Sequence, residues 1–565
     1  MRSLITNKTD SLLIIIFLYF IIIVQSASGK NIEQTIKLDP GWNSIFLEID
    51  PLENRCENVF KDIPIDSVWV WNSKSSSIEF IKNPDDLIFE PPSWFVYYPP
   101  EKPYAFKTTL FRIYGEQSYL IKLNGNKSVL LKLRGTPCLP KIDWKINSYN
   151  LVGFHLYPGK EPNFAEFFGP SIAHNNSDPD VYFLNSTEQW EKATKTKQMK
   201  SGEAYWVYCF DKTKYVGRLK VEVEIGDVLN FGENLVEQKL SLLNLSKDIS
   251  QISISYFKNN DSRSYEDVNI PISRWVPVSE NTGGWTDIGS NVNIEIEETS
   301  EIKLRLAVRR IDLPSNGSYT SILKINDNKG SMIYLPVSVS YNQSYSGLWV
   351  GNAVIKKVSQ PSSNNTKTIP TSSEFQFRLI VHVDKNGQAK LLKEVIQMWK
   401  QGEEKKQGKY VLITNENLLT NQDYIGPGLR DGRSMGRRIS SAVFSFSKPL
   451  LMEGTFSIGS SLSCGYTIGF NDPLNPFKHK YHPDHNNLDE EYKNIIKEAY
   501  DIHRKVIMTF TLEDPTNLNL SIAGWRDKDI GGIYKEEIKG LHKQSIFSEG
   551  IFRLHKVSNV EVLNE

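Results

Sequence analysis

Along most of this chain, aromatic and β-branched residues alternate with polar residues in short runs that Gly, Pro, Asn and Asp separate. A period of two places successive side chains on opposite faces of a strand, so the pattern predicts short antiparallel strands. Helical spacing is rare, and we expect short helices at Cys56–Lys61, Phe164–Phe168 and Leu488–His503. The predicted fold class is therefore mainly β.

Two segments of the N-terminal half carry the same motifs in the same order. The first contains LDPGWNSIFLEIDP, DSVWVWN and PSWFVYY, at 38–51, 66–72 and 92–98. The second contains INSYNLVGFHLYPG, DVYFLN and GEAYWVYC, at 146–159, 180–185 and 202–209. This order resembles the GWN…YWV repeats of secreted bacterial multidomain proteins, with Tyr149 in place of Trp42. We expect two tandem small β repeats, over 31–140 and 141–214.

Within the first repeat, Tyr104–Leu133 contains two strand patterns on either side of Asn124-Gly125. An Asn-Gly pair favours the type I′ turn of a two-residue hairpin. We therefore predict that these two strands pair with each other.

The tryptophans of the repeats have two interpretations. Sugar rings stack on indole rings, which makes four of them candidate glycan-binding residues: Trp42, Trp71, Trp94 and Trp206. The alternative is that the same rings fill the cores of small β units that otherwise lack bulk. We prefer the core interpretation, and the glycan interpretation stays open.

From 216 to 341 the strands become evenly spaced, which predicts a β-sandwich. This segment resembles bacterial immunoglobulin-like modules of the BACON type. The resemblance rests on a start at Phe231-Gly232, a mid-domain Trp275, a strand entry at Gly317-Ser318-Tyr319 and a closing strand at Leu335-Pro336-Val337. The resemblance implies an extracellular spacer or binding module. We expect Trp275 in the core of this sandwich.

The last segment, 345–565, contains further antiparallel strand patterns and is predicted to form an antiparallel β-barrel or curved sandwich, which hides sheet edges. The segments Asn352–Ser359 and Phe552–Ser558 are expected to pair and close it. Between the first two strands, the Ser- and Thr-rich stretch 360–373 is interpreted as a long hairpin loop.

The N-terminus has the layout of a secretory signal. Arg2 and Lys8 precede the apolar run Leu12–Val24, which is shorter than the ~20 residues of a membrane-spanning helix, and the small residues Ser26–Ser28 follow. We predict a signal peptide over 1–28, no transmembrane span after its cleavage, and a location outside the cell or in the cell envelope, extracellular or periplasmic. An uncleaved anchor is the alternative.

Charge and cysteine content exclude some classes of protein. The basic residues, Lys plus Arg, number 66, and the acidic residues, Asp plus Glu, also number 66. The chain therefore has no net positive charge that would favour nucleic acid as a partner. The 4 cysteines are far apart in the sequence and do not form a dense disulfide framework. Cys138 and Cys209 are candidates for a disulfide, with buried free thiols as the alternative.

All but two of the 9 histidines follow residue 380, and the C-terminal segment contains a candidate metal site. Its residues lie in NDPLNPFKHKYHPDHNNLD, at His479, His482, His485, Asp484 and Asp489. Imidazole and carboxylate are the usual ligands of zinc, which is the first candidate for a divalent cofactor. Pro483 excludes a helix, so the ligands are expected on a loop. The alternative is a rigid loop whose histidines cap backbone groups.

A second candidate site is the glycine- and arginine-rich stretch Ile425–Arg438. Arg433 and Arg437 are the candidate residues for binding a carboxylate or phosphate, with a solvated loop as the alternative. Ser461–Gly465 departs from the GxSxG pattern, and no catalytic residues are predicted.

These observations lead to one principal functional hypothesis, a secreted or cell-surface modular binding or adhesion protein that is non-catalytic and engages glycans or surface proteins. The alternative is a metal-dependent enzyme, a hydrolase, with its site in the C-terminal histidine-rich segment. A purely structural surface spacer is the third class.

We predict that the C-terminal segment binds a divalent transition metal through His479, His482 and at least one further group, for which His485, Asp484 and Asp489 are the nearest candidates. Chelation should then lower the melting temperature, because metal bound to the native state adds to its stability. Protonation of the imidazoles should release the metal below about pH 6. Metal analysis and the melting curve of His482→Ala, with and without zinc, provide the test. A chain without stoichiometric metal, whose melting His482→Ala leaves unchanged, contradicts the prediction.

Overall fold

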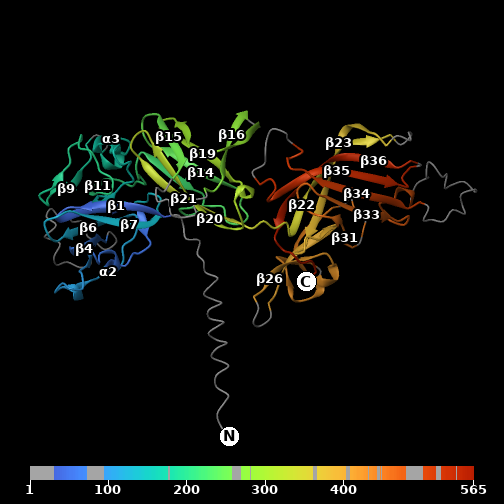
Figure 1. Cartoon of the computed structure of the whole chain (residues 1–565), viewed down its shortest axis with the longest axis horizontal. Coiled ribbons are helices and arrows are strands. Elements are labelled where there is room, and N and C mark those ends of the chain that lie inside the picture. The colour runs from blue at the N-terminus through green and yellow to red at the C-terminus, as the bar shows by residue number, and fades with distance from the viewer. Residues whose placement is uncertain are drawn as a thin grey trace, which may run out of the picture. The chain divides into compact units, whose positions relative to one another are not determined.

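The structure is a computed structural model. It describes residues 31–564 apart from 73–93, 176–177, 258–268, 280–281, 290, 361–365, 403–406, 431, 442–443, 445, 447, 479–499, 517–523 and 543. The chain divides into two compact units, which are described separately (Figure 1). Unit 1 comprises Met1–Trp275, Thr286–Val308 and Ser315–Tyr341, and unit 2 comprises Val276–Trp285, Arg309–Pro314 and Asn342–Glu565. Among the described residues, no helix has both the length and the apolar character needed to cross a bilayer.

The first repeat contains two small antiparallel sheets, of order β1-β7-β3 and β2-β6-β4-β5. Their strands are β1 (Ile32–Leu38), β2 (Gly41–Leu47), β3 (Ile49–Pro51), β4 (Ile65–Trp71), β5 (Trp94–Tyr97), β6 (Gln117–Leu123) and β7 (Val129–Pro137). Strands β1 and β2 run along β7 and β6 as one bent ribbon, in which Leu38 lies opposite Val129 and Gly41 opposite Leu123.

The predicted hairpin at Asn124-Gly125 is therefore wrong, because β6 and β7 belong to different sheets and do not pair with each other. Asn124-Gly125 instead lies at the corner of the ribbon, where Gly125 adopts a φ of 104°. The segment 124–128 is longer than the opposite segment 39–40, and the extra residues allow the ribbon to bend from one sheet into the other.

The second repeat forms one sheet of order β10-β9-β11-β8. Its elements are β8 (Ser148–Gly153), α3 (Phe164–Phe168), β9 (Val181–Leu184), β10 (Trp190–Lys192) and β11 (Ala204–Cys209). Each repeat contains a similar pair of hydrogen-bonded strands, which is β4–β5 in the first repeat and β9–β11 in the second. They differ in sheet order, because β8 pairs with β11 whereas β6 separates β2 from β4.

The predicted short helices of unit 1 are present. Helix α3 has the predicted bounds and begins with a capping box, in which the Asn163 side chain accepts the amide of Glu166 at 2.8 Å. Helix α2 (Cys56–Val59) is shorter than predicted. The predicted helix Leu488–His503 falls mostly on residues outside the description, and His503 itself lies in a strand, β34 (Ile502–Phe510).

The two repeats share an aromatic core. It includes Trp42, Trp69 and Trp94 from the first repeat and Trp190 and Trp206 from the second. Trp206, which is 1% exposed, lies at its centre. Its ring packs edge-on against three other tryptophan rings, with centroids 5.3 to 6.2 Å apart. Edge-to-face contacts at this separation are favourable beyond the area they bury. The repeats are therefore packed through a common core.

Residues 216–341 contain the predicted β-sandwich, with sheets of order β12-β14-β19-β16-β17 and β13-β21-β20-β15-β18. The strands are β12 (Leu219–Val223), β13 (Leu229–Asn230), β14 (Glu237–Asn244), β15 (Ser250–Tyr256), β16 (Ile272–Ser279), β17 (Thr282–Asp287), β18 (Val292–Ile296), β19 (Glu301–Val308), β20 (Gly317–Asp327) and β21 (Met332–Tyr341). The expectation that Trp275 belongs to the core is wrong. Trp275 is only partly buried, and the Arg305 guanidinium lies 5.0 Å from its ring centroid.

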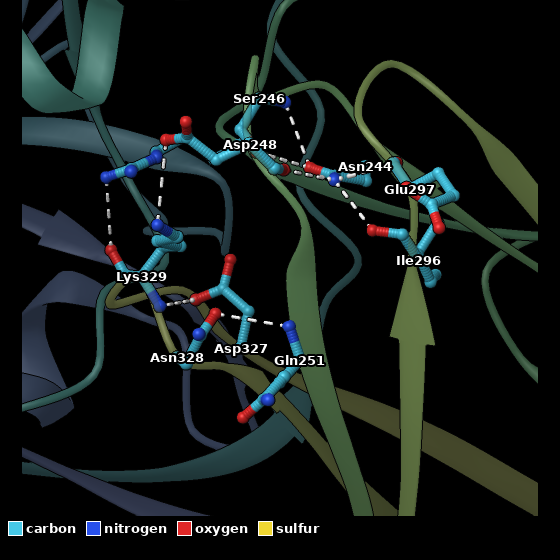
Figure 2. A network of polar contacts seen from close by, with 10 residues as sticks. Asn244, Ser246, Asp248, Gln251, Ile296, Glu297, Asp327, Asn328 and Lys329 are labelled. Carbon is cyan, nitrogen blue, oxygen red and sulfur yellow. Dashed lines mark hydrogen bonds and ion pairs between the residues drawn. The ribbon is translucent and has the colours of Figure 1, made fainter.

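A buried amide links the two sheets of the sandwich at one end. The side chain of Asn244, at the end of β14, donates to the carbonyls of Asp248, Ile296 and Glu297 at 2.8 to 3.1 Å (Figure 2). Its oxygen accepts the amide and hydroxyl of Ser246. Because Asn244 is 1% exposed, these bonds replace the water that its amide loses on folding.

The main sheet of unit 2 has the order β31-β24-β23-β22-β36-β35-β34-β33-β32 and curls on itself (Figure 1). Its remaining strands are β22 (Gly347–Ser359), β23 (Thr368–Val383), β24 (Ala389–Leu391), β31 (Leu450–Leu451), β32 (Glu453–Gly454), β33 (Ser461–Ile468), β35 (Asp529–Lys539) and β36 (Ile546–Ser558). The edge strands β31 and β32 are separated only by Met452, which is 3% exposed. The chain itself thus joins the two edges, and the curled sheet encloses one large core.

The segments Asn352–Ser359 and Phe552–Ser558 lie on strands that do pair, β22 and β36. The register brings the two predicted segments together only at Asn352–Arg553 and Ala353–Phe552. Strands β22 and β23 also form the predicted hairpin, although β23 already begins at Thr368, inside the predicted loop 360–373. A smaller sheet joins β25 (Glu394–Lys400) to β26 (Lys409–Ile413), β27 (Tyr424–Ile425) and β30 (Arg437–Ser440). All four cysteines, Cys56, Cys138, Cys209 and Cys464, are free, so the candidate Cys138–Cys209 disulfide is not formed.

We predict that Trp206→Ala destabilises unit 1 by roughly 3–5 kcal/mol, the usual range for deleting a fully buried large aromatic. Trp275→Ala is the matched control, and it should cost clearly less because that ring keeps partial contact with solvent. Chemical denaturation of both variants measures the difference. Equal losses would show that the shared aromatic core does not dominate the stability of unit 1.

Candidate functional site

The least expected group of residues in unit 1 is a buried cluster of two carboxylates and one imidazole. Glu48 follows β2, Glu116 precedes β6, and His155 follows β8 of the second repeat. The Nε2 of His155 lies 2.6 Å from Oε1 of Glu116, and its Nδ1 lies 3.9 Å from Oε2 of Glu48. Glu48 is 7% exposed and His155 is 6% exposed. Ionisable groups are rarely buried to this extent unless they are paired or functional.

Glu48 and His155 occupy the same position in the two repeats. Aligning Asn43 with Asn150 places Glu48 against His155, and Pro51 against Pro158. The contacts between the repeats bring these two positions together, since the amide of Phe46 donates to Gly202 at 2.8 Å and the hydroxyl of Ser44 donates to Ala204 at 2.9 Å. An acid in one copy thus meets a base in the other.

Burial changes the ionisation of both groups. Loss of water raises the pKa of Glu48 to about 7, and the negative charge of Glu116 adds to the increase against the opposing effect of His155. For His155, burial lowers the pKa. The charge and hydrogen bond of Glu116, together with Glu48, outweigh burial and raise the pKa of His155 above its usual value. Burial therefore favours the protonated form of Glu48, and the two carboxylates favour the protonated form of His155.

A cleft of about 880 Å³ opens above Glu48, within the range of small-ligand sites. The first repeat, the second repeat and strand β21 of the sandwich all line it, the last through Met332 and Tyr334. Its charged lining residues are Glu33, Lys37, Asp39, Glu48, Glu188, Lys200 and Glu203. Apolar surface comes from Pro40, Trp42 and Pro158 among others. The cleft therefore combines a polar rim, small apolar patches and a buried carboxylate.

The lysines of the rim are already paired. Lys37 lies 2.7 Å from Asp39, and Lys200 lies 2.8 Å from Glu203. The Lys37 partner and the Ser128 hydroxyl lower the pKa of Asp39. These pairs are exposed and contribute little to stability, so their side chains are free to exchange partners with a ligand.

The tryptophans predicted from the sequence lie around the shared core. Trp42 lines the cleft and is 8% exposed, with the Lys122 ammonium 5.2 Å from its ring centroid. Trp94 and Trp206 are buried, and Trp71 is partly buried against Trp206. Their packing follows the core interpretation, and of these four only Trp42 lines the cleft. Glycan binding through these rings remains a prediction.

The predicted metal ligands His479, His482, His485, Asp484 and Asp489 lie outside the described residues. Across the part of the chain that is described, no three His, Cys, Asp or Glu side chains are arranged to hold a metal ion. The zinc hypothesis therefore stays a prediction. Arg433 and Arg437 are exposed on two short strands of unit 2, β29 (Arg433–Met435) and β30.

No family model matches this sequence, and no curated protein matches it. Among solved structures, the CupB2 chaperone of Pseudomonas aeruginosa is 11% identical, with 30% of this chain and 97% of that chain covered and a TM-score of 0.16. A Bacteroides ovatus multidomain protein that includes DUF1735 is 12% identical, with 60% and 96% covered and a TM-score of 0.16. A PapD-like domain of human CEP192 is 12% identical, with 22% and 87% covered and a TM-score of 0.15. At these TM-scores the likenesses carry no functional argument.

The stability of unit 1 should decrease as pH rises from about 5 to about 8. Both raised pKa values mean that the folded unit holds more protons than the unfolded chain in this interval, so proton loss favours unfolding. Glu48→Gln should flatten this dependence by on the order of 2 kcal/mol. Denaturation at pH 5, 6.5 and 8 measures it, with the exposed Glu101→Gln as control. Parallel pH profiles for wild type and Glu48→Gln would contradict the assignment.

Proposed function

We propose that this chain is a secreted or cell-surface modular binding protein, and that it engages a glycan through the cleft above Glu48. The cleft is the observation that supports the proposal. It has the volume of a small-ligand site, and its lining combines lysines, which donate hydrogen bonds, with carboxylates, which accept them. A sugar presents several hydroxyl groups, each of which both donates and accepts, so it is complementary to a rim that offers lysines and carboxylates together.

The apolar patches support the same class of ligand. Pro40, Trp42 and Pro158 lie among the polar lining residues, and sugar rings have C–H faces that pack against such surfaces. The three modules that line the cleft are held together by the shared aromatic core and by the bond from the Met332 amide to His155 at 3.3 Å. A rigid, preformed cleft lowers the entropy cost of binding.

Binding of soluble oligosaccharides to the full chain tests the proposal. Calorimetry with neutral oligomers of glucose and of N-acetylglucosamine should detect at least one ligand. Lys37→Ala combined with Lys200→Ala should weaken it about tenfold, since each change removes a hydrogen-bond donor from the rim. Lys127→Ala is the matched control, because Lys127 is exposed and does not line the cleft.

Two results would contradict the proposal. If no oligosaccharide binds, the ligand is not a glycan. If oligosaccharides bind and the double lysine variant retains full affinity, the binding site lies elsewhere in the chain.

A further inference from the structure

One edge of a sheet in the first repeat is open. Strand β1 is the outer strand of the sheet β1-β7-β3, so only one of its two edges is paired. The amide of Leu52 donates to the carbonyl of Arg134 on β7, so the backbone groups of Arg134 face β3. Glu33 lies opposite Arg134, and its own backbone groups therefore face away from β7. Because the direction alternates along a strand, the same holds for Thr35 and Lys37.

The open backbone groups have no partner within the described part of the chain. Glu33, Thr35 and Lys37 each supply one N–H and one C=O, and no described residue forms a hydrogen bond with any of them. The three residues are two apart, so their donors and acceptors extend over about 13 Å at the spacing of a strand. Such a row of groups is a template for a further strand.

The open edge of β1 lines the cleft of about 880 Å³. All six residues of Ile32–Lys37 belong to its lining. Other parts of the lining are Lys200–Ala204 of the second repeat and Met332 and Tyr334 of β21. Six strand residues extend over about 20 Å, so the cleft can hold an extended segment of similar length beside β1. The edge is thus recessed, and a single chain reaches it more easily than a folded domain does.

Strand β1 is held in place before any ligand arrives. The side chain of Gln34 donates to the carbonyl of Phe46 at 2.9 Å and accepts the amide of Glu48 at 3.0 Å. These bonds attach β1 to the corner between β2 and β3. Ile36 and Leu38 are buried in the core of the first repeat on the same side of the strand. A preformed edge lowers the entropy cost of adding a strand.

The side chains along the open edge indicate the chemistry of the added strand. Glu33, Thr35 and Lys37 are exposed on one face of β1, where the Thr35 hydroxyl donates to Glu33 at 3.1 Å. Residues directly opposite each other on antiparallel strands lie about 5 Å apart, and opposite charges stabilise such pairs. The present partners of Glu33 and Lys37, which are Lys132 and Asp39, are exposed and can be exchanged.

We infer that β1 binds an extended segment of a partner protein, which adds to the sheet antiparallel to β1. This segment carries a basic residue opposite Glu33 and an acidic residue opposite Lys37. The inference goes beyond the proposed function and does not rest on it, because it concerns a second class of partner at the same cleft. A bound segment and a bound glycan exclude each other there.

The test is calorimetry on the full chain with the end-blocked peptide Glu-Val-Thr-Val-Lys. In the antiparallel register its lysine lies opposite Glu33 and its glutamate opposite Lys37. The peptide should bind about threefold tighter or more than Lys-Val-Thr-Val-Glu, and salt should reduce the difference. N-methylation of its threonine and lysine, whose amides face β1, should weaken binding about tenfold or more. N-methylation of its two valines, whose amides face away, is the matched control and should have little effect.

Amide hydrogen exchange gives a second measurement that only an added strand should change in this pattern. The bound peptide should slow exchange at the amides of Glu33, Thr35 and Lys37. The amides of Gln34 and Ile36 already bond to β7, and their exchange should stay the same.

A variant of the chain tests the same edge. Thr35→Pro removes the central N–H of the open edge and leaves the bonds to β7 in place, and proline is tolerated at such edge positions. It should weaken peptide binding about tenfold. Thr35→Val keeps the N–H and should bind within about twofold of wild type. If Thr35→Pro fails to fold, the N-methylated peptides test the wild-type chain instead.

Several results would overturn the inference. Failure of both peptides to bind, or equal binding of the two N-methylated forms, shows that no strand is added to β1. If the chain alone dimerises in sedimentation and Thr35→Pro abolishes the dimer, the edge belongs to a second copy of this chain. Oligosaccharide binding without peptide binding leaves the proposed glycan function intact. Peptide binding with the alternating protection, in a chain that binds no oligosaccharide, supports this inference and contradicts the glycan proposal.

Discussion

A cluster of large aromatic side chains shared by the two repeats holds them against each other in unit 1. Each repeat also has a core of its own, but Trp206 belongs to the cluster that both repeats share, and it is 1% exposed because rings from both copies surround it. Burial of large aromatic side chains stabilises strongly, and edge-to-face contacts make the fit specific. The core therefore determines the relative position of the copies and, with it, the position of every residue at their contact.

That position places an ionisable carboxyl group where water is excluded. Glu48 and His155 occupy equivalent places in the two copies, and the contact brings them to 3.9 Å, with Glu116 as the partner of His155. The free energy of the shared core offsets the cost of burying the carboxylate. An ionisable group buried at such a cost beside an open cleft is a candidate functional residue. The chemistry of the cleft thus follows from the packing beneath it.

Unit 2 is built differently, because a single sheet curls until its own two edges meet. Strands β22 and β36 form the centre of the sheet, and the curl continues until the edge strands β31 and β32 are neighbours in the chain through Met452. Closure leaves few unpaired strand edges, which is the usual protection of a β protein against edge-to-edge association. Long strands near the two ends of the unit make this possible, because they pair over most of their length.

The type and position of many elements can be predicted from the residues alone. Alternation of apolar and polar residues predicts the mainly β fold and the sandwich, because a period of two and the position of turns are local properties. The bounds of helix Phe164–Phe168 were predictable for the same reason, since its cap lies next to it in the chain. The repeat alignment even contained the signal for the site, an acid and a histidine at one shared position inside apolar runs.

The roles of these elements depend on contacts between segments that are far apart in the chain. It placed Asn124-Gly125 at a corner, since strand partners are chosen by the whole sheet and not by the turn. It left Trp275 half-buried, because burial depends on which neighbours arrive from distant segments. It also converted Glu48 from one carboxylate among many into a buried group with a pKa of about 7, since desolvation and the approach of His155 arise only when the two repeats pack.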